Sequence, residues 1–162
     1  MRNIISATGV GFLTTEGKCV IADVMYAKGQ AFVIAAALLK RNNGYEYAVL
    51  HLLCQGIEVA LKGLLLHINY DQFKLELKSL GHNLIKIVNS TTCASGLKPP
   101  RYELQVELET LSKLYSKHLL RYGSNHDIFV SASTIPSDRL FRRIAAVFRL
   151  VRMREIVRPP IT

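Results

Sequence analysis

The stretch YEYAVLHLLCQGIEVALKGLLLH, residues Tyr45–His67, decides the fold of this chain. The polar residues in its body are His51, Gln55, Glu58 and Lys62, at successive offsets of four, three and four residues. That spacing places them on one stripe of an α-helix. Nearly every other residue between them is apolar or glycine, so neighbouring helices must cover most of the circumference. The stretch therefore predicts a central helix with one polar seam.

The polar seam, formed by His51, Gln55, Glu58 and Lys62, has two interpretations. Glu58 and Lys62 are four residues apart, and such a pair stabilises a helix surface by about 0.2–0.5 kcal/mol. A stripe that faces solvent is the expected interpretation. The alternative is a seam that faces a cleft or a dimer axis and contacts a ligand.

The composition bounds the class of protein. The chain has 162 residues, 49% of them hydrophobic, and a formal net charge of +9. This length suits one domain with its own core. The apolar stretches are interrupted by charged and polar residues, whereas a membrane-spanning helix needs about 20 nearly uninterrupted apolar residues. The N-terminus also lacks the apolar run of a signal peptide. We therefore expect a cytoplasmic protein, outside the membrane, whose apolar surface is partly covered by another subunit.

The remainder of the chain also predicts helices. Beyond the central helix, the helical period or helix-capping signals mark four stretches, which are residues 23–41, 83–89, 100–122 and 137–157. Asp23 is a plausible N-cap for the first of them, and Asn42-Asn43-Gly44 supplies its stop. Residues 91–100 and 123–136 are expected to be loops. Residues 69–80 form either a loop or a further short helix.

The first 22 residues differ in character from the rest of the chain. They combine glycines with β-forming residues that alternate loosely, which predicts a short hairpin or an irregular N-terminal arm over residues 1–22. The helical domain is then expected over residues 23–162. Four or five helices joined by short connections imply an all-α, up-and-down bundle.

The last predicted helix is strongly basic. Seven arginines and a single acid, Glu155, lie between Arg139 and Arg158. Its apolar residues share one face at 100° per residue. The arginines that lie mostly on the opposite face are Arg139, Arg142, Arg143, Arg149 and Arg154. They form either a surface that follows the phosphates of a nucleic acid, or a solvated face that partly neutralises the acidic residues 103, 107 and 109. The sequence leaves both open.

The cysteines and the remaining histidines predict no metal site, no disulfide framework and no cofactor. The cysteines are Cys19, Cys54 and Cys93, without a C-x-x-C pair or histidines at zinc-like spacing. Cys54 lies in the apolar helix pattern, where a free cysteine acts as a small hydrophobic residue. His82 is expected to cap or to pack at the start of its helix. His67 and His118 belong to no recognisable constellation.

Three segments share a known pattern in order and spacing. Leu50–Leu66 contains a polar residue followed by Q-x-x-E-x-x-x-K-x-x-L. Gly81-His82-Asn83-Leu84 reads as G-H-D/N-L, and Leu120-Arg121-Tyr122 as an arginine–tyrosine turn. These segments resemble the central helix, the opening of the next helix and the turn after the fourth helix of HEPN domains (higher eukaryotes and prokaryotes nucleotide-binding). The resemblance spans roughly residues 23–155.

The resemblance implies a helical bundle that forms a homodimer. It also implies two kinds of role. Some family members are metal-independent endoribonucleases of toxin–antitoxin or defence systems, which use an R-x-x-x-x-H motif near the dimer axis. Others lack the motif and act as binding subunits, often beside a nucleotidyltransferase. The partner of this chain would then be a protein of the nucleotidyltransferase or antitoxin type.

The chain contains that string, from Arg121 to His126. Cleavage of RNA through its own 2′-hydroxyl needs a proton acceptor and donor, such as histidine, and a cation near the phosphate. However, Tyr122 stands where the family motif has a polar residue, and Gly123 should leave Arg121 at a helix end and His126 in a loop. We therefore expect a non-catalytic dimeric subunit that binds RNA, a nucleotide or a partner protein. The alternative is an endoribonuclease toxin that uses Arg121 and His126.

Overall fold

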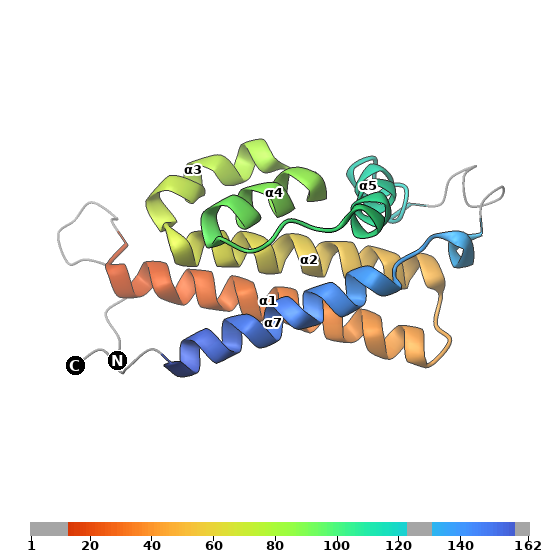
Figure 1. Cartoon of the computed structure of the whole chain (residues 1–162), viewed down its shortest axis with the longest axis horizontal. Helices are drawn as coiled ribbons and strands as arrows, with labels where there is room; N and C mark the ends of the chain where they lie inside the picture. The colour runs from red at the N-terminus through yellow and green to blue at the C-terminus, as the bar shows by residue number, and fades with distance from the viewer. Residues whose placement is uncertain (1–12, 123–130, 158–162) are drawn as a thin grey trace.

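The structure, a computed structural model, describes residues 13–122 and 131–157 (Figure 1). Most of these residues are helical and none of them forms a strand, which confirms the all-α prediction. The elements are α1 (Thr15–Arg41), α2 (Glu46–Ile68), α3 (Tyr70–Leu80), α4 (Leu84–Ser95), α5 (Tyr102–Ser116), the short 3-10 helix η1 (Ala132–Thr134) and α7 (Asp138–Val157).

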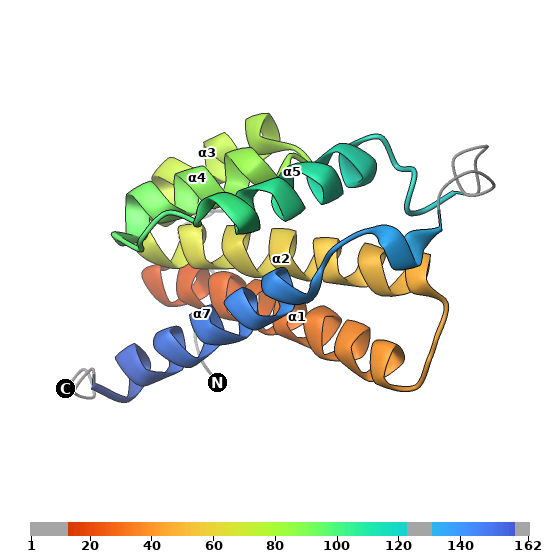
Figure 2. The ribbon, with the colours of Figure 1, turned by 45° about the vertical axis from the view of Figure 1, so that its right-hand side comes forward.

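Helix α2 lies at the centre of the molecule. It runs antiparallel to α1, with α1 and α7 on one side and α3, α4 and α5 on the other (Figures 1 and 2). Of its 23 residues, 15 are buried. The predicted central helix over residues 45–67 is therefore confirmed to within one residue at each end, and so is its enclosure by neighbouring helices.

Helices α1 and α2 approach each other closely where glycine removes the side chain. A Cβ atom added to Gly29 of α1 would lie 2.2 Å from the backbone nitrogen of Ala60. One added to Gly63 of α2 would lie 2.6 Å from the backbone nitrogen of Tyr26. Both distances are far inside van der Waals contact, so the two backbones pack directly against each other at these glycines.

The start of α1 corrects the predicted N-terminal arm. The helix begins at Thr15, and the side chain of the N-cap residue Thr14 accepts a hydrogen bond from the backbone N–H of Gly17 at 3.0 Å. The predicted cap, Asp23, lies inside the helix. The arm is therefore wrong for residues 15–22, where packing of Ile21 against the core outweighs β propensity. Residues 1–12 lie outside the described part.

Helices α3 and α4 decide two predictions: whether residues 69–80 are helical, and where the loop after the next helix begins. Residues 70–80 form the helix α3, capped by the side chain of Asn69, which accepts from Gln72 N–H at 3.2 Å. Helix α4 continues to Ser95, so the predicted loop is wrong for residues 91–95. Thr91 is buried within α4, where its hydroxyl donates to the Ile87 carbonyl at 2.8 Å.

Helix α5 ends earlier than its apolar pattern predicts. It stops at Ser116, and His118 adopts a left-handed backbone conformation with φ of 59°. Leu120 is nevertheless buried, because the turn after the helix folds back onto the core. The predicted continuation of the helix to residue 122 is therefore wrong.

Two helices, α1 and α2, are long and apolar enough to cross a membrane on length and composition alone. In α2, 78% of the apolar window is buried inside the protein, as in the core helix of a soluble domain. In α1, which is near the N-terminus, only 22% of the window is buried. The α1 helix therefore presents apolar surface that the described chain does not cover.

Candidate functional site

The inner half of the polar seam is buried. Glu58 is 6% exposed and Lys62 8% exposed. The Lys62 ammonium group donates to Glu58 Oε1 at 2.7 Å and to the carbonyl oxygen of Gly81 at 2.6 Å. The expected interpretation as a solvated stripe is therefore wrong for these two residues. His51 and Gln55, the outer members of the seam, are half-buried.

Two further residues complete the surroundings of the Glu58 carboxylate. His82 Nδ1 lies 2.9 Å from Glu58 Oε2, and the Tyr115 hydroxyl also forms a hydrogen bond with this carboxylate. Burial alone would raise the pKa of Glu58. The hydrogen bonds from Lys62, His82 and Tyr115 outweigh it and hold that pKa below its ordinary value. Glu58 is thus an ionised carboxylate inside the protein.

His82 packs at the start of its helix, as expected, with its ring 5.9 Å from that of Tyr115. It does not cap the helix. The cap of α4 is Asn83, whose side chain accepts from the backbone N–H of Lys86 at 3.0 Å. His82 instead binds Glu58, while 48% of its side chain remains exposed. When the imidazole is neutral and donates from Nδ1, its Nε2 is left as a proton acceptor.

An outer layer of rings and charge lies next to this buried carboxylate. We call it the rim, and its members are His51, His82, His118, Arg121 and Tyr122. The ring of His82 lies 5.6 Å from that of His118, which lies 6.5 Å from that of Tyr122. Tyr115 lies behind them, with its ring 5.7 Å from that of His51. His118, Arg121 and Tyr122 are exposed.

The electrostatics of the rim favour neutral imidazole at His51. Burial lowers the pKa of His51, and the nearby charges of Arg121 and His118 lower it further. Its Nδ1 atom is buried and has no hydrogen-bond partner within the described part of the chain. Among the described residues, no group of three or more histidine, cysteine, aspartate or glutamate residues is arranged to hold a metal ion. The rim therefore offers proton acceptors beside a guanidinium group.

The three segments that resemble HEPN motifs meet at this site. Glu58 and Lys62 come from α2, Gly81 and His82 from the turn before α4, and Arg121 from the turn after α5. The sequence did not single out Tyr115 or His118 as site residues. A signal for Tyr115 was present in the apolar face of α5, but a tyrosine on such a face is usually core.

The predicted pair of Arg121 and His126 is placed only in part. Arg121 lies in the turn after α5, where its backbone N–H donates to the carbonyl of His118 at 3.1 Å. Its charge acts on His51 and on Tyr115. His126 lies outside the described residues.

The basic helix α7 buries the predicted apolar face, with Leu140, Ile144 and Val147 each 5–7% exposed. Its arginines divide into two groups. Arg139 Nη1 lies 2.9 Å from an oxygen of the buried Glu107, and Arg143 Nη2 donates to the Lys98 carbonyl at 3.0 Å.

The second group faces solvent. Arg142, Arg149 and Arg152 are exposed, and the side chain of Arg154 lies outside the described part. The predicted neutralisation of the acidic helix α5 is thus seen for one pair, Arg139 and Glu107. Arg142, whose Nε donates to the Asp138 carbonyl at 3.4 Å, therefore remains exposed to a partner together with Arg149 and Arg152.

All three cysteines are free. Cys54 is fully buried in α2, as expected for a small hydrophobic residue, and burial raises the pKa of its thiol. Cys19 and Cys93 are exposed.

Comparison with known proteins finds no family model that matches the chain, and no similar curated protein or solved structure. A functional assignment therefore depends on the chemistry of the residues themselves.

Proposed function

We propose that the chain is a homodimeric, HEPN-like helical-bundle subunit that binds RNA and has no catalytic activity of its own. The observation that carries this proposal is the outward face of α7. Arg142, Arg149 and Arg152 are exposed there, and no carboxylate lies within salt-bridge distance of them in the part of the chain that the structure describes. The opposite face of the helix packs in the core through Leu140, Ile144 and Val147, so the helix presents these arginines on its outward surface.

Such a surface suits the phosphate backbone. A guanidinium group matches phosphate oxygens, and the formal charge of +9 attracts polyanions. No base-reading motif accompanies the arginines. Binding should therefore be sensitive to salt and tolerant of sequence.

The experiment is a mobility-shift assay with single-stranded RNA at low salt. The test protein carries Arg142→Ser, Arg149→Ser and Arg152→Ser. The matched control removes the same charge from α3 and α5 through Lys74→Ser, Lys78→Ser and Lys113→Ser, all at exposed lysines. RNA binding should be lost only in the arginine variant. Equal binding by the two variants would contradict the proposal, and binding of a nucleotide or a protein instead of RNA would replace it.

The dimer is supported by an uncovered apolar stripe on α1. We call it the α1 stripe, and its exposed members are Val24, Ala27, Ala31, Ile34 and Leu38. They recur every three or four residues, so they lie on one face of the helix. Val24, Ile34 and Leu38 are 62%, 58% and 54% exposed. A contiguous apolar face of this kind is usually covered by a partner, and a second copy would cover both stripes at once.

Light scattering after gel filtration tests this dimer. Ile34→Glu should convert it to a monomer, because a charge would be buried in the interface. Leu75→Glu is the control, since Leu75 is 79% exposed on α3, away from the stripe. A wild-type monomer, or flotation of the wild type with lipid vesicles, would count against the dimer and for another occupant of the stripe.

A second function, metal-independent RNA cleavage with Arg121 and His126, is favoured by one observation. Arg121 lies beside the histidines of the rim, one of which is held by a buried carboxylate. In this reaction a histidine accepts the 2′-hydroxyl proton, the 2′-oxygen attacks phosphorus, and the 5′-oxygen leaves with a proton from a second donor. The arginine stabilises the charge on the phosphate.

Cleavage of RNA in the presence of a chelator separates the two functions. The cleavage hypothesis expects activity that Arg121→Ala or His126→Ala abolishes, and expression of the wild type that harms the cell. A wild type that binds RNA without cutting it supports the non-catalytic proposal. Loss of cutting in His82→Ala but not in His126→Ala would assign the proton transfer to the rim.

We also infer that the protein is cytoplasmic and works with a partner protein of the nucleotidyltransferase or antitoxin type. The burial of α2 supports the first inference, because a core helix has no apolar face left for lipid. Cell fractionation of the full chain tests it, and recovery in the membrane fraction would contradict it.

A further inference from the structure

A small apolar cavity lies between α2, α4, α5, α7 and the segment that joins α4 to α5. Its volume is about 60 Å³. The walls include Ile57 and Leu61 of α2, Val88 of α4, Leu104 of α5 and Val147 of α7. Thr91 and Thr92 also belong to the lining, and the Thr91 hydroxyl already donates to the Ile87 carbonyl. The five side chains named first have no polar atom, so the interior favours an alkyl group over water.

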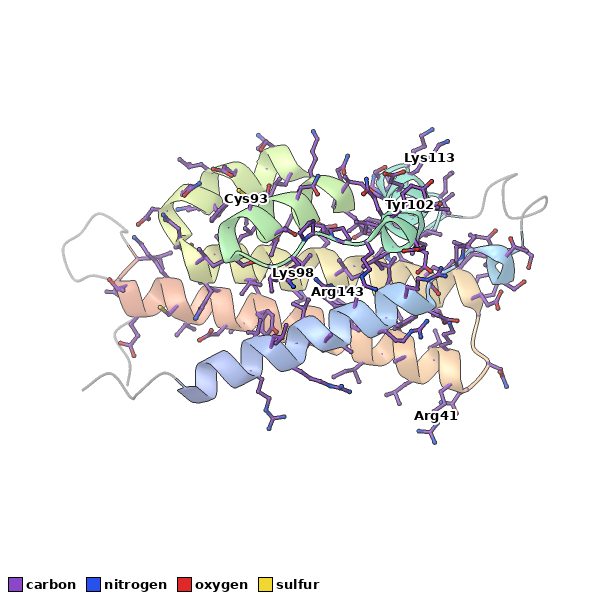
Figure 3. All side chains as sticks on the ribbon, in the orientation of Figure 1. Arg41, Cys93, Lys98, Tyr102, Lys113 and Arg143 are labelled. Carbon is purple, nitrogen blue, oxygen red and sulfur yellow. The ribbon has the colours of Figure 1, made fainter. Side chains whose placement is uncertain are left out.

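Two cations border this cavity. Lys98, on the connecting segment, and Arg143, on α7, both belong to its lining, and Figure 3 shows them on neighbouring segments. Arg143 Nη2 donates to the Lys98 backbone carbonyl, which ties α7 to the connecting segment. Neither side chain has a carboxylate within salt-bridge distance in the described part of the molecule. Arg143 keeps further N–H donors that this one bond does not use.

We propose that this cavity binds a small monocarboxylate, with its alkyl end among the apolar walls and its carboxylate on Arg143 and Lys98. The positive charge at the cavity mouth selects an anion, and a guanidinium group binds a carboxylate through charge-assisted hydrogen bonds. The volume limits the chain. A cavity of roughly 150 Å³ holds benzene, so about 60 Å³ holds two or three carbons, with the rest of a short chain in the mouth. This proposal does not depend on RNA binding.

Chain length gives the first test. Isothermal titration calorimetry measures the binding of acetate, butanoate, pentanoate and octanoate to the full chain. Each buried methylene contributes about 0.8 kcal/mol, which is about a fourfold gain in affinity per carbon. The affinity should rise from acetate to pentanoate and then stop rising. A rise that continues to octanoate would indicate an open apolar surface, and no binding of any of these acids would identify the cavity as a packing gap. Either result overturns the proposal.

Charge gives the second test. Arg143→Met should weaken pentanoate binding by about tenfold, since a charge-assisted hydrogen bond is lost, while binding of pentan-1-ol stays unchanged. Lys98→Met should also weaken the binding of pentanoate. Arg41→Met is the control at an exposed arginine at the end of α1 (Figure 3). Equal loss of the acid and the alcohol would show damage to the fold and not a carboxylate site, and would contradict the proposal.

Filling the cavity gives an independent check. Leu104 is half-buried at the wall, and Leu104→Phe adds bulk there without adding charge. Pentanoate binding should be abolished while circular dichroism and the unfolding midpoint stay close to those of the wild type. If pentanoate binds this variant with the affinity it has for the wild type, it does not occupy the cavity, and the proposal is wrong.

Discussion

The substitution Lys62→Met tests the buried ion pair at the heart of the molecule. It keeps the length and the apolar stem of the side chain but removes the ammonium group that binds Glu58 and the Gly81 carbonyl. Removing one partner of a buried pair costs about 3–5 kcal/mol. Glu58 keeps its hydrogen bonds to His82 and Tyr115, so we expect the lower end, about 3 kcal/mol. In a domain of this size that corresponds to a fall in Tm of roughly 6–12 °C.

The pH dependence of this loss has a definite sign. In the wild type the folded pKa of Glu58 is below its ordinary value, so Glu58 contributes stability above that value and loses it as the pH falls through the folded pKa. In Lys62→Met the carboxylate stays buried without its main cation, so its folded pKa should rise above the ordinary 4.5. The loss should then be largest near neutral pH and shrink as the pH falls through that raised pKa.

Urea unfolding followed by circular dichroism, between neutral pH and about 4.5, measures both effects. Lys78→Met, at an exposed lysine of α3, is the control and should stay within about 0.5 kcal/mol of the wild type. Adding Glu58→Gln to Lys62→Met should recover part of the stability at neutral pH, because no buried charge is then left unpaired. A loss below about 1 kcal/mol, or no recovery in the double variant, would refute the buried pair.

Two further predictions concern packing. Gly29→Ala should lower the free energy of unfolding by about 1–3 kcal/mol, because the added Cβ would meet the backbone of Ala60. Alanine is otherwise the better helix former, so a gain in stability on urea unfolding would contradict the close approach of α1 and α2. In the native protein an aromatic disulfide reagent should modify Cys19 and Cys93 quickly and Cys54 only on unfolding. The reason is that Cys54 is fully buried and burial raises the pKa of its thiol. Mass spectrometry of the labelled peptides measures this, and rapid labelling of Cys54 would show that the core opens.

The central helix could be predicted from the sequence because its signal is local. Polar residues at helical spacing within a long apolar stretch define one helix whatever surrounds it. The environment of the seam could not be predicted in the same way. Glu58 and His82 are 24 residues apart, and only the turn before α4 brings them together. A pair four residues apart looks the same in sequence whether it is solvated or buried.

The helix boundaries show the limits of local signals. Glycines and β-forming residues predicted an arm, but Thr14 caps a helix whose Gly17 and Ala22 are buried. The end of α5 was placed at Gly123, whereas the chain turns earlier at His118 with a left-handed backbone. Residues other than glycine seldom adopt that conformation, so the residues around His118 carried no clear stop signal. Tertiary contacts decided both positions.

The salt dependence of RNA binding tests the proposed function most directly. Fluorescence anisotropy with a single-stranded RNA gives the affinity at a series of KCl concentrations. On single strands each phosphate contact contributes about 0.7 to the slope of log affinity against log salt. The wild type should bind at low salt with a steep slope, and loss of Arg142, Arg149 and Arg152 should reduce that slope by about 2. No binding at low salt, or an unchanged slope in the arginine variant, would contradict RNA binding by this face of α7.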